Sequence, residues 1–443
     1  MISEFSIFYS QLVSLLNDEF GERISNRVIA DSIFFFMMFL WFLQSKDRPF
    51  LQILLDKAIL KDLNFFQDYL SPLCFGTLNA KEEELTEFYD IFSFVQSSFK
   101  NSYYQNHIFG FHVPNNFFSN LFENCFNKFY WSSSEFQYSS VKKPIISPNI
   151  FEKLYIKGSE NKKELGKVYT PFELAMLLCQ SCIFVKIHSR LLKEHKQLSL
   201  QTNSLDFFKS LDQLSTSEFW HFFPPQIHQQ LVSIILDEIS DFRVLDPAIG
   251  TGSLILTYLQ VCLTLYSQLN RITNFLSPSP VSFLYSLVSN IAGIDIDPIA
   301  LEICSFRLWL YIFRFLQTEE QYKLFSTLKL NLHLKDTLLN DEPDSSWDLI
   351  LANPPFVDIK TLTSERTKQL MSRFQTVSHR INLFSLFLEY SHKCLTATGV
   401  LGFIIPASFL YGTSYRPLRE LLIQTGLIKR VIRLPEQIFP EIQ

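Results

Sequence analysis

The sequence WDLILANPPF, residues 347–356, joins a short apolar run to two successive prolines. Residues 347–352 have the length and composition of a buried β-strand, whereas neither proline has the backbone N–H that a sheet requires. The strand should therefore end at Asn353, leaving the Asn353 amide and the Phe356 ring at its carboxyl end. Such a segment is suited to hold something flat and polar, although an ordinary strand-ending turn has the same pattern.

Further strands alternate with helices from about residue 165 onward. Apolar runs bounded by turn residues predict the strands, and a helical period predicts the segments between them. This alternation predicts an α/β fold with a doubly wound, mostly parallel sheet. The predicted strands are 242–246, 291–295, 332–336, 347–352, 399–406 and 428–435, and the predicted helices are 252–266, 298–316, 381–397 and 414–426.

A chain of 443 residues is too long for one compact core, so at least two domains are expected. Residues 1–145 carry helical periodicity without a strong strand pattern, which predicts a helical N-terminal domain. Residues 146–443 form the predicted α/β domain, with insertions at about 186–235 and 266–290. The N-terminal helices are expected at 4–16, 30–44 and 81–99.

Composition and charge limit the class of protein. Apolar residues make up 47% of the chain and the net charge is -5. A chain that grips a nucleic-acid backbone alone usually has a basic excess, so any such grip must be local or supplied by a partner. Cys179 and Cys182, the one close pair among seven cysteines, lie in an apolar helical stretch, which favours reduced thiols over a zinc site.

The same composition indicates a cytoplasmic protein with no membrane span. The N-terminus lacks a signal-peptide pattern. The most apolar run, Ile33 to Leu43, is shorter than the roughly 20 residues that a membrane span needs, so it is expected to be a buried helix.

A glycine-rich turn follows the first predicted strand, in the sequence DPAIGTGS over residues 246–253. Gly250 and Gly252 allow a tight turn and a close approach of a ligand to the backbone, and the next helix begins with free N–H groups. A dinucleotide fingerprint requires a third glycine where Ile255 stands, so NAD is disfavoured. Asp246, just before the turn, is placed to face an ammonium or sulfonium group.

The second and third strands also end in acidic residues. Asp295 is placed to hold ribose hydroxyls, and Ile296 offers an apolar surface to a purine. Asp336 could accept from an exocyclic amine. Each carboxylate taken singly is more often a solvated loop residue, but three successive strand ends together favour a nucleoside-bearing ligand.

The fourth strand ends in the opening sequence. The Asn353 side-chain carbonyl and the Pro354 backbone carbonyl supply two acceptors, which suit an exocyclic NH2 group with two protons to donate. Phe356 can stack on the ring that carries this amine. The fourth strand is therefore predicted to hold the acceptor amine beside a ligand bound at the other three.

The order of these segments resembles the adenine-specific (N6) DNA methyltransferases that use S-adenosylmethionine, in the arrangement whose cofactor motifs precede the catalytic one. The stretch after residue 356 is similar to type I and type IIG restriction-modification methylases. The sequences that carry the resemblance are GKVYTPFELA (166–175), DPAIGTGSL (246–254), GIDIDPIALEICSFRL (293–308) and NPPF (353–356).

The resemblance implies roles for the matching residues, with DNA as partner and S-adenosylmethionine as cofactor. It implies a cradle for the cofactor's methionine part at Thr170, Pro171, Asp246, Ala248, Gly250 and Gly252. It implies ribose binding by Asp295 and adenine binding by Ile296 and Asp336. It implies that the target base is held by Asn353, Pro354, Pro355 and Phe356.

The chain also departs from the family pattern. The family sheet has a seventh strand after LPEQIFPEIQ (434–443), so a chain truncated at the C-terminus is expected, with recognition supplied by a specificity subunit or a C-terminal recognition domain on a separate chain. Two alternatives stay open: an inactive methylase fragment, and an RNA or protein amide N-methyltransferase. The basic residues of 360–380 could meet phosphates, although a solvated helix face is an equally good interpretation.

Overall fold

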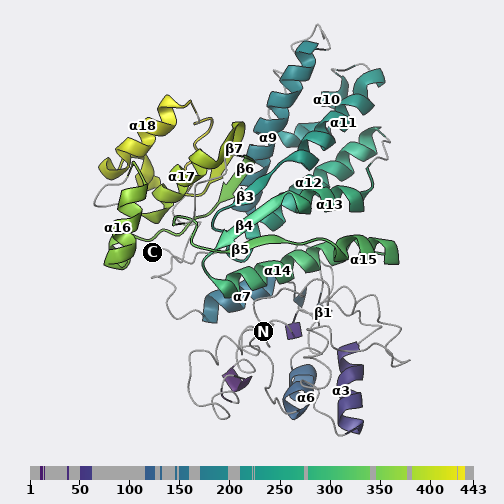
Figure 1. Ribbon diagram of the computed structural model, residues 1–443. Helices are drawn as coiled ribbons and strands as arrows, with labels where there is room; N and C mark the ends of the chain where they lie inside the picture. The colour runs from purple at the N-terminus through teal and green to yellow at the C-terminus, as the bar shows by residue number, and fades with distance from the viewer. Residues whose placement is uncertain are drawn as a thin grey trace. The chain divides into compact units, whose positions relative to one another are not determined.

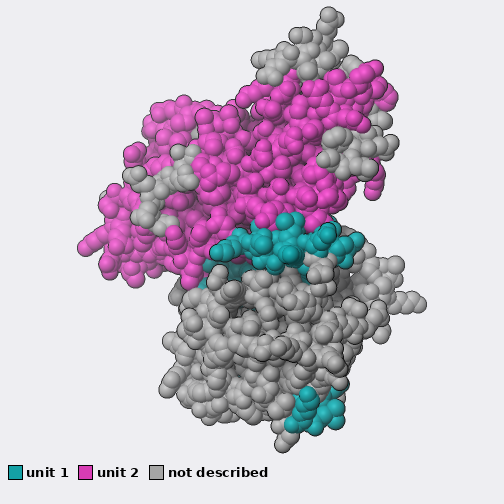
Figure 2. All heavy atoms as spheres, turned by 45° about the vertical axis from the view of Figure 1, so that its right-hand side comes forward, with its two compact units in different colours: residues 1–158, 298–329 teal, residues 159–297, 330–443 magenta. Residues whose placement is uncertain are grey.

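The computed structural model describes residues 10–12, 14, 37–38, 50–61, 115–124, 130–131, 145–146, 149–158, 170–197, 210–221, 223, 225–273, 278–339, 346–376, 382–426 and 428–434. The expected helix over 81–99 lies outside these residues, and those over 4–16 and 30–44 lie mostly outside them. The chain divides into two compact units, residues 1–158 with 298–329 and residues 159–297 with 330–443 (Figure 2). The expected domain boundary after residue 145 stays a prediction.

The described part of the first unit is mostly helical, which confirms the helical N-terminal region. Arg307 forms a buried ion pair with Glu152 at 3.4 Å and donates to Asn149 Oδ1 at 3.2 Å, which ties two helices of this unit together. A short parallel strand pair was not predicted from the sequence. The elements are α3 (Phe50–Leu60), α6 (Asn115–Asn124), β1 (Tyr130–Trp131), β2 (Ile145–Ile146), α7 (Asn149–Gly158), α14 (Pro298–Phe313) and α15 (Glu319–Ser326).

The second unit is built on a five-stranded sheet in which every neighbouring pair is parallel. The spatial order is β5-β4-β3-β6-β7, so the chain reverses its direction of travel across the sheet between β3 and β6. This confirms the predicted α/β fold and places the switch point, where ligands bind in such sheets, at the carboxyl ends of β3 and β6. The strands are β3 (Val244–Asp246), β4 (Ile291–Asp295), β5 (Asn331–Leu334), β6 (Trp347–Ala352) and β7 (Leu395–Phe403).

Helices of the second unit lie on both sides of this sheet (Figure 1). One side carries α9 (Phe172–Gln197), α10 (Ser217–His221), α11 (Pro225–Asp241), α12 (Ser253–Thr273) and α13 (Pro280–Ser289). The other carries α16 (Ser364–Arg373), α17 (Leu383–Cys394) and α18 (Arg416–Gln424).

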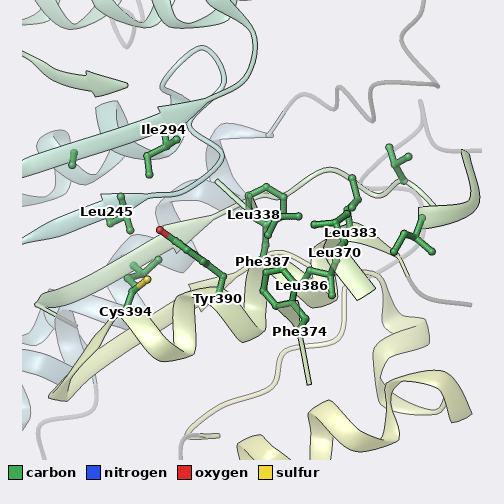
Figure 3. Packing of buried hydrophobic residues seen from close by; sticks show 14 residues of the cluster. Leu245, Ile294, Leu338, Leu370, Phe374, Leu383, Leu386, Phe387, Tyr390 and Cys394 are labelled. Atoms are coloured by element: carbon green, nitrogen blue, oxygen red, sulfur yellow. The ribbon is translucent and has the colours of Figure 1, made fainter. Parts of the chain in front are cut away.

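Helix α17 covers one face of the sheet with a buried apolar cluster (Figure 3). Leu386, Phe387 and Tyr390 recur at helical spacing and pack with residues that point out of the strands, such as Leu245 and Ile350. This burial is the main source of stability on that face, because apolar area removed from water contributes about 25 cal/mol per Å². The packing fixes α17 beside the carboxyl end of β6.

Helix α9 packs closely on the opposite face. A Cβ on Gly402 of β7 would lie 2.6 Å from the Cys182 sulfur and 3.2 Å from Leu178 Cδ1, so only glycine permits this approach. By length and composition, Phe172–Glu194 is the one described segment that could cross a membrane. Its packing on the sheet, where Cys182 and Leu178 lie against Gly402, accounts for that apolar character.

The cysteines of the described residues are buried and form no disulfide, as the sequence predicted for the close pair. They are Cys179, Cys182, Cys262, Cys304 and Cys394. Burial raises the pKa of the Cys182 thiol to about 12. Burial also raises the pKa of the Cys179 and Cys262 thiols, so these three thiols stay protonated and behave as small apolar groups.

Several predicted strands need correction. The strand predicted over 242–246 begins at Val244, and the strand predicted over 399–406 runs from Leu395 to Phe403. The predicted strand over 332–336 ends at Leu334, so Asp336 lies two residues beyond it. The strand predicted at 428–435 is wrong for its described part, 428–434, which is in no strand and exposes Val431 by 58% and Ile432 by 48%. An apolar run becomes a strand only where a neighbouring edge completes its hydrogen bonds, and β7 pairs only with β6 in the described part of the chain.

Candidate active site

The turn after β3 is held open by glycine and ordered by Asp246. Gly250 and Gly252 have φ angles of 53° and 85°, in the region that side chains avoid. No heavy atom lies within 4 Å of the place where a Gly250 Cβ would stand, so this backbone borders free space. Asp246, only 1% exposed, accepts a hydrogen bond from Ala248 N at 3.0 Å and so fixes the entry to the turn.

Asp295 links this turn to the end of β4. One oxygen accepts from Gly250 N at 2.8 Å and the other from Asp297 N at 2.9 Å. Ile249 N also donates to Ile294 O at 3.0 Å. The turn lies so close to β4 that a Cβ on residue 293, a glycine, would stand 2.2 Å from Ile249 Cδ1.

Two carboxyl groups thus meet in a poorly solvated place. Burial, together with the neighbouring Asp295 charge, raises the pKa of the Asp246 carboxyl to about 8. Burial also raises the pKa of Asp295. Neither carboxyl pairs with a Lys or Arg side chain of the described residues. A positively charged ligand would favour their ionised forms, so this end of the sheet is suited to a cation.

Ile296 and Asp336 border the same edge. The Ile296 side chain is 56% exposed, as an apolar surface for a flat ring would be. Asp336 accepts from Leu338 N at 3.1 Å and forms an ion pair with Arg366 Nη2 of α16 at 2.8 Å. The predicted phosphate contact at Arg366 is therefore already engaged with a predicted cofactor residue, a pairing that nothing in the local sequence of either residue indicates.

Asn353 and Thr170 meet at the carboxyl end of β6. Asn353 Nδ2 donates to the Thr170 hydroxyl at 2.8 Å, although the two residues are 183 positions apart. Asn353 Oδ1 is buried and has no partner among the described residues. Buried polar atoms are nearly always paired, so an unpaired buried acceptor marks a place where a ligand donor fits.

The contact between Thr170 and Asn353 joins two segments that the sequence assigned to different tasks. The resemblance implied a cofactor role for Thr170 and Pro171, and Pro171 O accepts from Leu174 N and Ala175 N at the start of α9. The Thr170 hydroxyl orients the Asn353 amide and leaves the amide oxygen without a partner among the described residues, while the cofactor role of Thr170 stays a prediction. The long separation explains why sequence reasoning missed this pairing.

The Phe356 ring belongs to an aromatic cluster. It lies edge-on to Phe384 of α17, with ring centroids 6.4 Å apart, and Phe384 in turn contacts Tyr415 at 5.0 Å and Phe409 at 6.4 Å. Pro354 is buried and Pro355 is partly exposed. The cluster holds the Phe356 ring in place, and the three supporting rings were not predicted from the sequence.

The basic segment over 360–380 is only partly described, because Arg380 lies outside the described residues. Lys360 and Lys368 are exposed, and Arg366 is engaged with Asp336. Helix α16 begins with Thr363 as its cap and buries Leu370 in the apolar cluster beneath. The apolar cluster thus anchors α16, and Lys368 is exposed on its surface.

A parallel sheet with this strand order, a glycine turn after β3, an acidic residue at the end of β4 and Asn-Pro-Pro-Phe after β6 define the methyltransferase class of α/β folds. Within that class, residues 289–439 match the family model of the Eco57I restriction-modification methylase. Over these residues the chain is similar to the Eco57I restriction-modification methylases.

Curated proteins support the same relationship. RM.MjaORFECS2P of Methanocaldococcus jannaschii, which carries the name of a type II restriction enzyme and methyltransferase, is 26% identical over 270 residues, covering 58% of this chain and 22% of that protein. The type II methyltransferase M.BanIII of Aneurinibacillus aneurinilyticus is 26% identical over 224 residues, covering 48% of this chain and 35% of that protein. The chain thus spans about a fifth to a third of these relatives' length.

A solved structure shares the fold. The type IIL restriction-modification enzyme MmeI, solved in complex with DNA, matches with a TM-score of 0.57 and 16% sequence identity, over 96% of this chain and 53% of that chain. At this identity the likeness concerns the fold alone.

Proposed function

We propose that the chain transfers a methyl group from S-adenosylmethionine to N6 of adenine in DNA, as part of a restriction-modification system in the cytoplasm. The observation that carries the proposal is the buried Asn353 Oδ1, left without a partner by the bond from Nδ2 to Thr170. An adenine amino group is a donor of the right kind for this oxygen.

The arrangement explains how a poor nucleophile would react. The N6 lone pair of adenine is delocalised into the ring. Asn353 Oδ1 and the Pro354 carbonyl would each accept one N–H and draw the nitrogen toward tetrahedral geometry, which frees the lone pair. Positioning in line with the methyl donor then supplies much of the rate. N6 would take the methyl group as the bond from carbon to sulfur breaks and its electron pair stays on sulfur. The cationic methylated amine is acidic enough to release its extra proton to water, so no dedicated general base is required.

The residues of the β3 and β4 ends fit S-adenosylmethionine. When bound, this cofactor supplies a methyl group activated by a positively charged sulfur. Asp246, whose pKa burial raises to about 8, would face the cationic methionine part. Gly250 leaves room for the ligand, and in this proposal Asp295 would contact the ribose and Ile296 the purine.

Duplex DNA hides N6 inside the base stack, so the target adenine must be flipped outward, and Phe356 would then stack on it. MmeI was solved with DNA, which supports DNA as the partner class. The net charge of -5 supports a further partner, a specificity subunit or a recognition domain on a separate chain, to grip the duplex.

The test is methyl transfer from radiolabelled S-adenosylmethionine to DNA and, in parallel, to RNA, followed by nucleoside separation. We expect label in N6-methyladenine from DNA, and a rate at least about 100-fold lower for Asn353→Ala. Calorimetry should show that Asn353→Ala still binds the cofactor. Asn331→Ala, at an exposed position of β5, is the matched control and should transfer normally.

Three outcomes would count against the proposal. Label in N4-methylcytosine would contradict the base, and label in RNA alone would contradict the substrate. A full rate in Asn353→Ala would remove the role given to its side chain.

A further inference from the structure

We propose that Leu410 and Tyr411, in the turn after β7, form an apolar wedge that contacts the base stack of duplex DNA where the target base leaves it. This inference rests on the proposed function. The turn contains two 3-10 segments, η8 (Ala407–Leu410) and η9 (Thr413–Tyr415), joined by Tyr411 and Gly412.

The turn is rigid. Arg419 Nη1 donates to Phe409 O at 2.7 Å and to Gly412 O at 2.8 Å, which clamps both sides of Tyr411. Gly412 N donates to Ser408 O at 2.7 Å. A Cβ on Gly412 would stand 2.8 Å from Ser408 O, so the chain reverses here as tightly as glycine allows.

This rigid turn presents apolar side chains to solvent. Phe409 is 6% exposed and anchors the turn, whereas Leu410 is 45% exposed and Tyr411 is 73% exposed. An aromatic side chain on a fixed backbone has few torsions to lose on binding, which is why tyrosine is favoured in recognition surfaces. A Tyr411 side chain held on an anchored turn is therefore suited to contact a ligand.

The turn belongs to the edge that carries the site. Strands β6 and β7 are parallel neighbours, with Ala352 opposite Phe403, so Asn353 and the turn follow the same ends of adjacent strands. Phe384 contacts both Phe356 and Phe409. One aromatic cluster therefore supports the residue predicted to stack on the flipped base and the turn that exposes Tyr411.

The place of the turn, at the edge that carries Asn353, selects a nucleic acid as the occupant, and the charge of the segment is compatible with it. Across residues 403–420 the one carboxylate, Glu420, pairs with Arg416 at 2.8 Å, and Arg419 adds a positive charge beside the turn. A polyanion can approach this turn without meeting an unpaired carboxylate of the segment. Extruding a base costs a few kcal/mol of stacking and pairing, and an inserted apolar side chain offsets part of that cost.

The experiment measures DNA binding by the full chain, without any need for methyl transfer. Fluorescence anisotropy compares an intact labelled duplex with the same duplex carrying an abasic site opposite one adenine, where the stack is already open. The unmutated chain should bind the abasic duplex at least about 5-fold more tightly, because the wedge enters without breaking a pair.

Variants assign the preference to the wedge. Tyr411→Ala should lose it and keep its affinity for the intact duplex, whereas Tyr411→Trp should retain it. Ile423→Ala, at a 64% exposed residue of α18, is the matched control and should behave as the unmutated chain.

Each other outcome is decisive. Equal binding of both duplexes by the unmutated chain, or an unchanged preference in Tyr411→Ala, would overturn the wedge and leave methyl transfer untouched. Binding of neither duplex would also overturn the wedge, because an open stack offers it entry without a recognition partner, and would leave the proposed methyl transfer to its own test. A docking surface for another protein would give the first of these results.

Discussion

The polar side chains at the two ends of β6 differ in their hydrogen-bond partners. At the amino end, Asp348 accepts from Lys186 Nζ at 3.3 Å, from Arg243 N at 3.3 Å and from the Thr396 hydroxyl at 3.3 Å. At the carboxyl end, Asn353 has one partner and a buried oxygen without any in the described part of the chain. The polar side chain at the amino end has its hydrogen-bond partners within the protein. The one at the carboxyl end keeps an acceptor that a ligand donor could fill.

The neighbouring strands repeat the contrast. Asp246 and Asp295 end β3 and β4 with backbone N–H partners, and no Lys or Arg of the described residues neutralises them. Asp348 has Lys186 as its cation. Burying a carboxylate without a cation costs free energy, so Asp246 and Asp295 lower the stability of the fold. A cationic ligand bound beside them can restore that stability.

The largest expected effect on stability comes from breaking the satisfied end. Lys186→Met should lower the free energy of unfolding by about 3 kcal/mol, because Asp348 loses its counter-ion while still largely buried. Urea unfolding measures the change, and calorimetry should show cofactor affinity within about 2-fold of normal once the chain is folded.

A second substitution isolates that pair. Adding Asp348→Asn to Lys186→Met should recover part of the loss, because the neutral amide needs no counter-ion and still accepts hydrogen bonds. If the double variant were as unstable as the sum of the two single variants, the ion pair would not be the cause.

The next effect comes from Asp246, through pH. Its pKa is raised from 3.8 to about 8 in the folded chain, so between these values the unfolded chain binds fewer protons. The contribution of this group to stability is therefore fully present below about pH 4 and is lost as pH rises through about 8.

Asp246→Asn should flatten this dependence and raise the free energy of unfolding at about pH 9 by on the order of 2 kcal/mol, while cofactor binding weakens. Its side-chain oxygen can still accept from Ala248 N, so the turn is kept. Urea unfolding at about pH 5 and about pH 9 tests this. Asp241→Asn, at the exposed end of α11, is the control, and the same pH dependence in both variants would refute the role of Asp246.

The smallest effect concerns how Asn353 is oriented. Thr170→Ala should lower the turnover rate about 10-fold by freeing the Asn353 amide, whereas Thr170→Ser keeps the hydroxyl and should be near normal. Cofactor affinity should stay unchanged in both variants. Weaker cofactor binding at a normal turnover rate would instead support the direct cofactor role that the resemblance implied for Thr170.

Much of the fold could be predicted because its signals are local. Strand β4 has the predicted bounds, Ile291–Asp295, and β6 has those of the opening sequence, Trp347–Ala352. Both are buried apolar runs closed by turn residues, which is how buried parallel strands look in a sequence. The strand prediction at 428–435 was wrong for its described part. A strand forms only where an adjacent strand is available for pairing, and the apolar pattern of the segment does not show whether one is.

The site divides in the same way. The sequence indicated Asp246, Asp295 and Asn353, because residues that end parallel strands gather at one edge whatever the packing. It did not indicate that Arg366 engages Asp336 or that three further rings support Phe356. These pairings join residues far apart in the chain, and only the packing of the helices on the sheet determines them.

The sequence alone therefore determined the strand-helix alternation, the glycine turn and the residue types at the strand ends, because each depends on neighbours along the chain. Only the tertiary structure decided that Asn353 Nδ2 donates to the Thr170 hydroxyl while Asn353 Oδ1 stays without a partner in the described part of the chain. It also decided that Lys186 neutralises one end of β6 while the acids at the other edge stay without a cation of the described residues. The physical reason is that burial and hydrogen-bond partners depend on the packed fold. Together they set the charge of a side chain and leave some of its donors or acceptors unpaired.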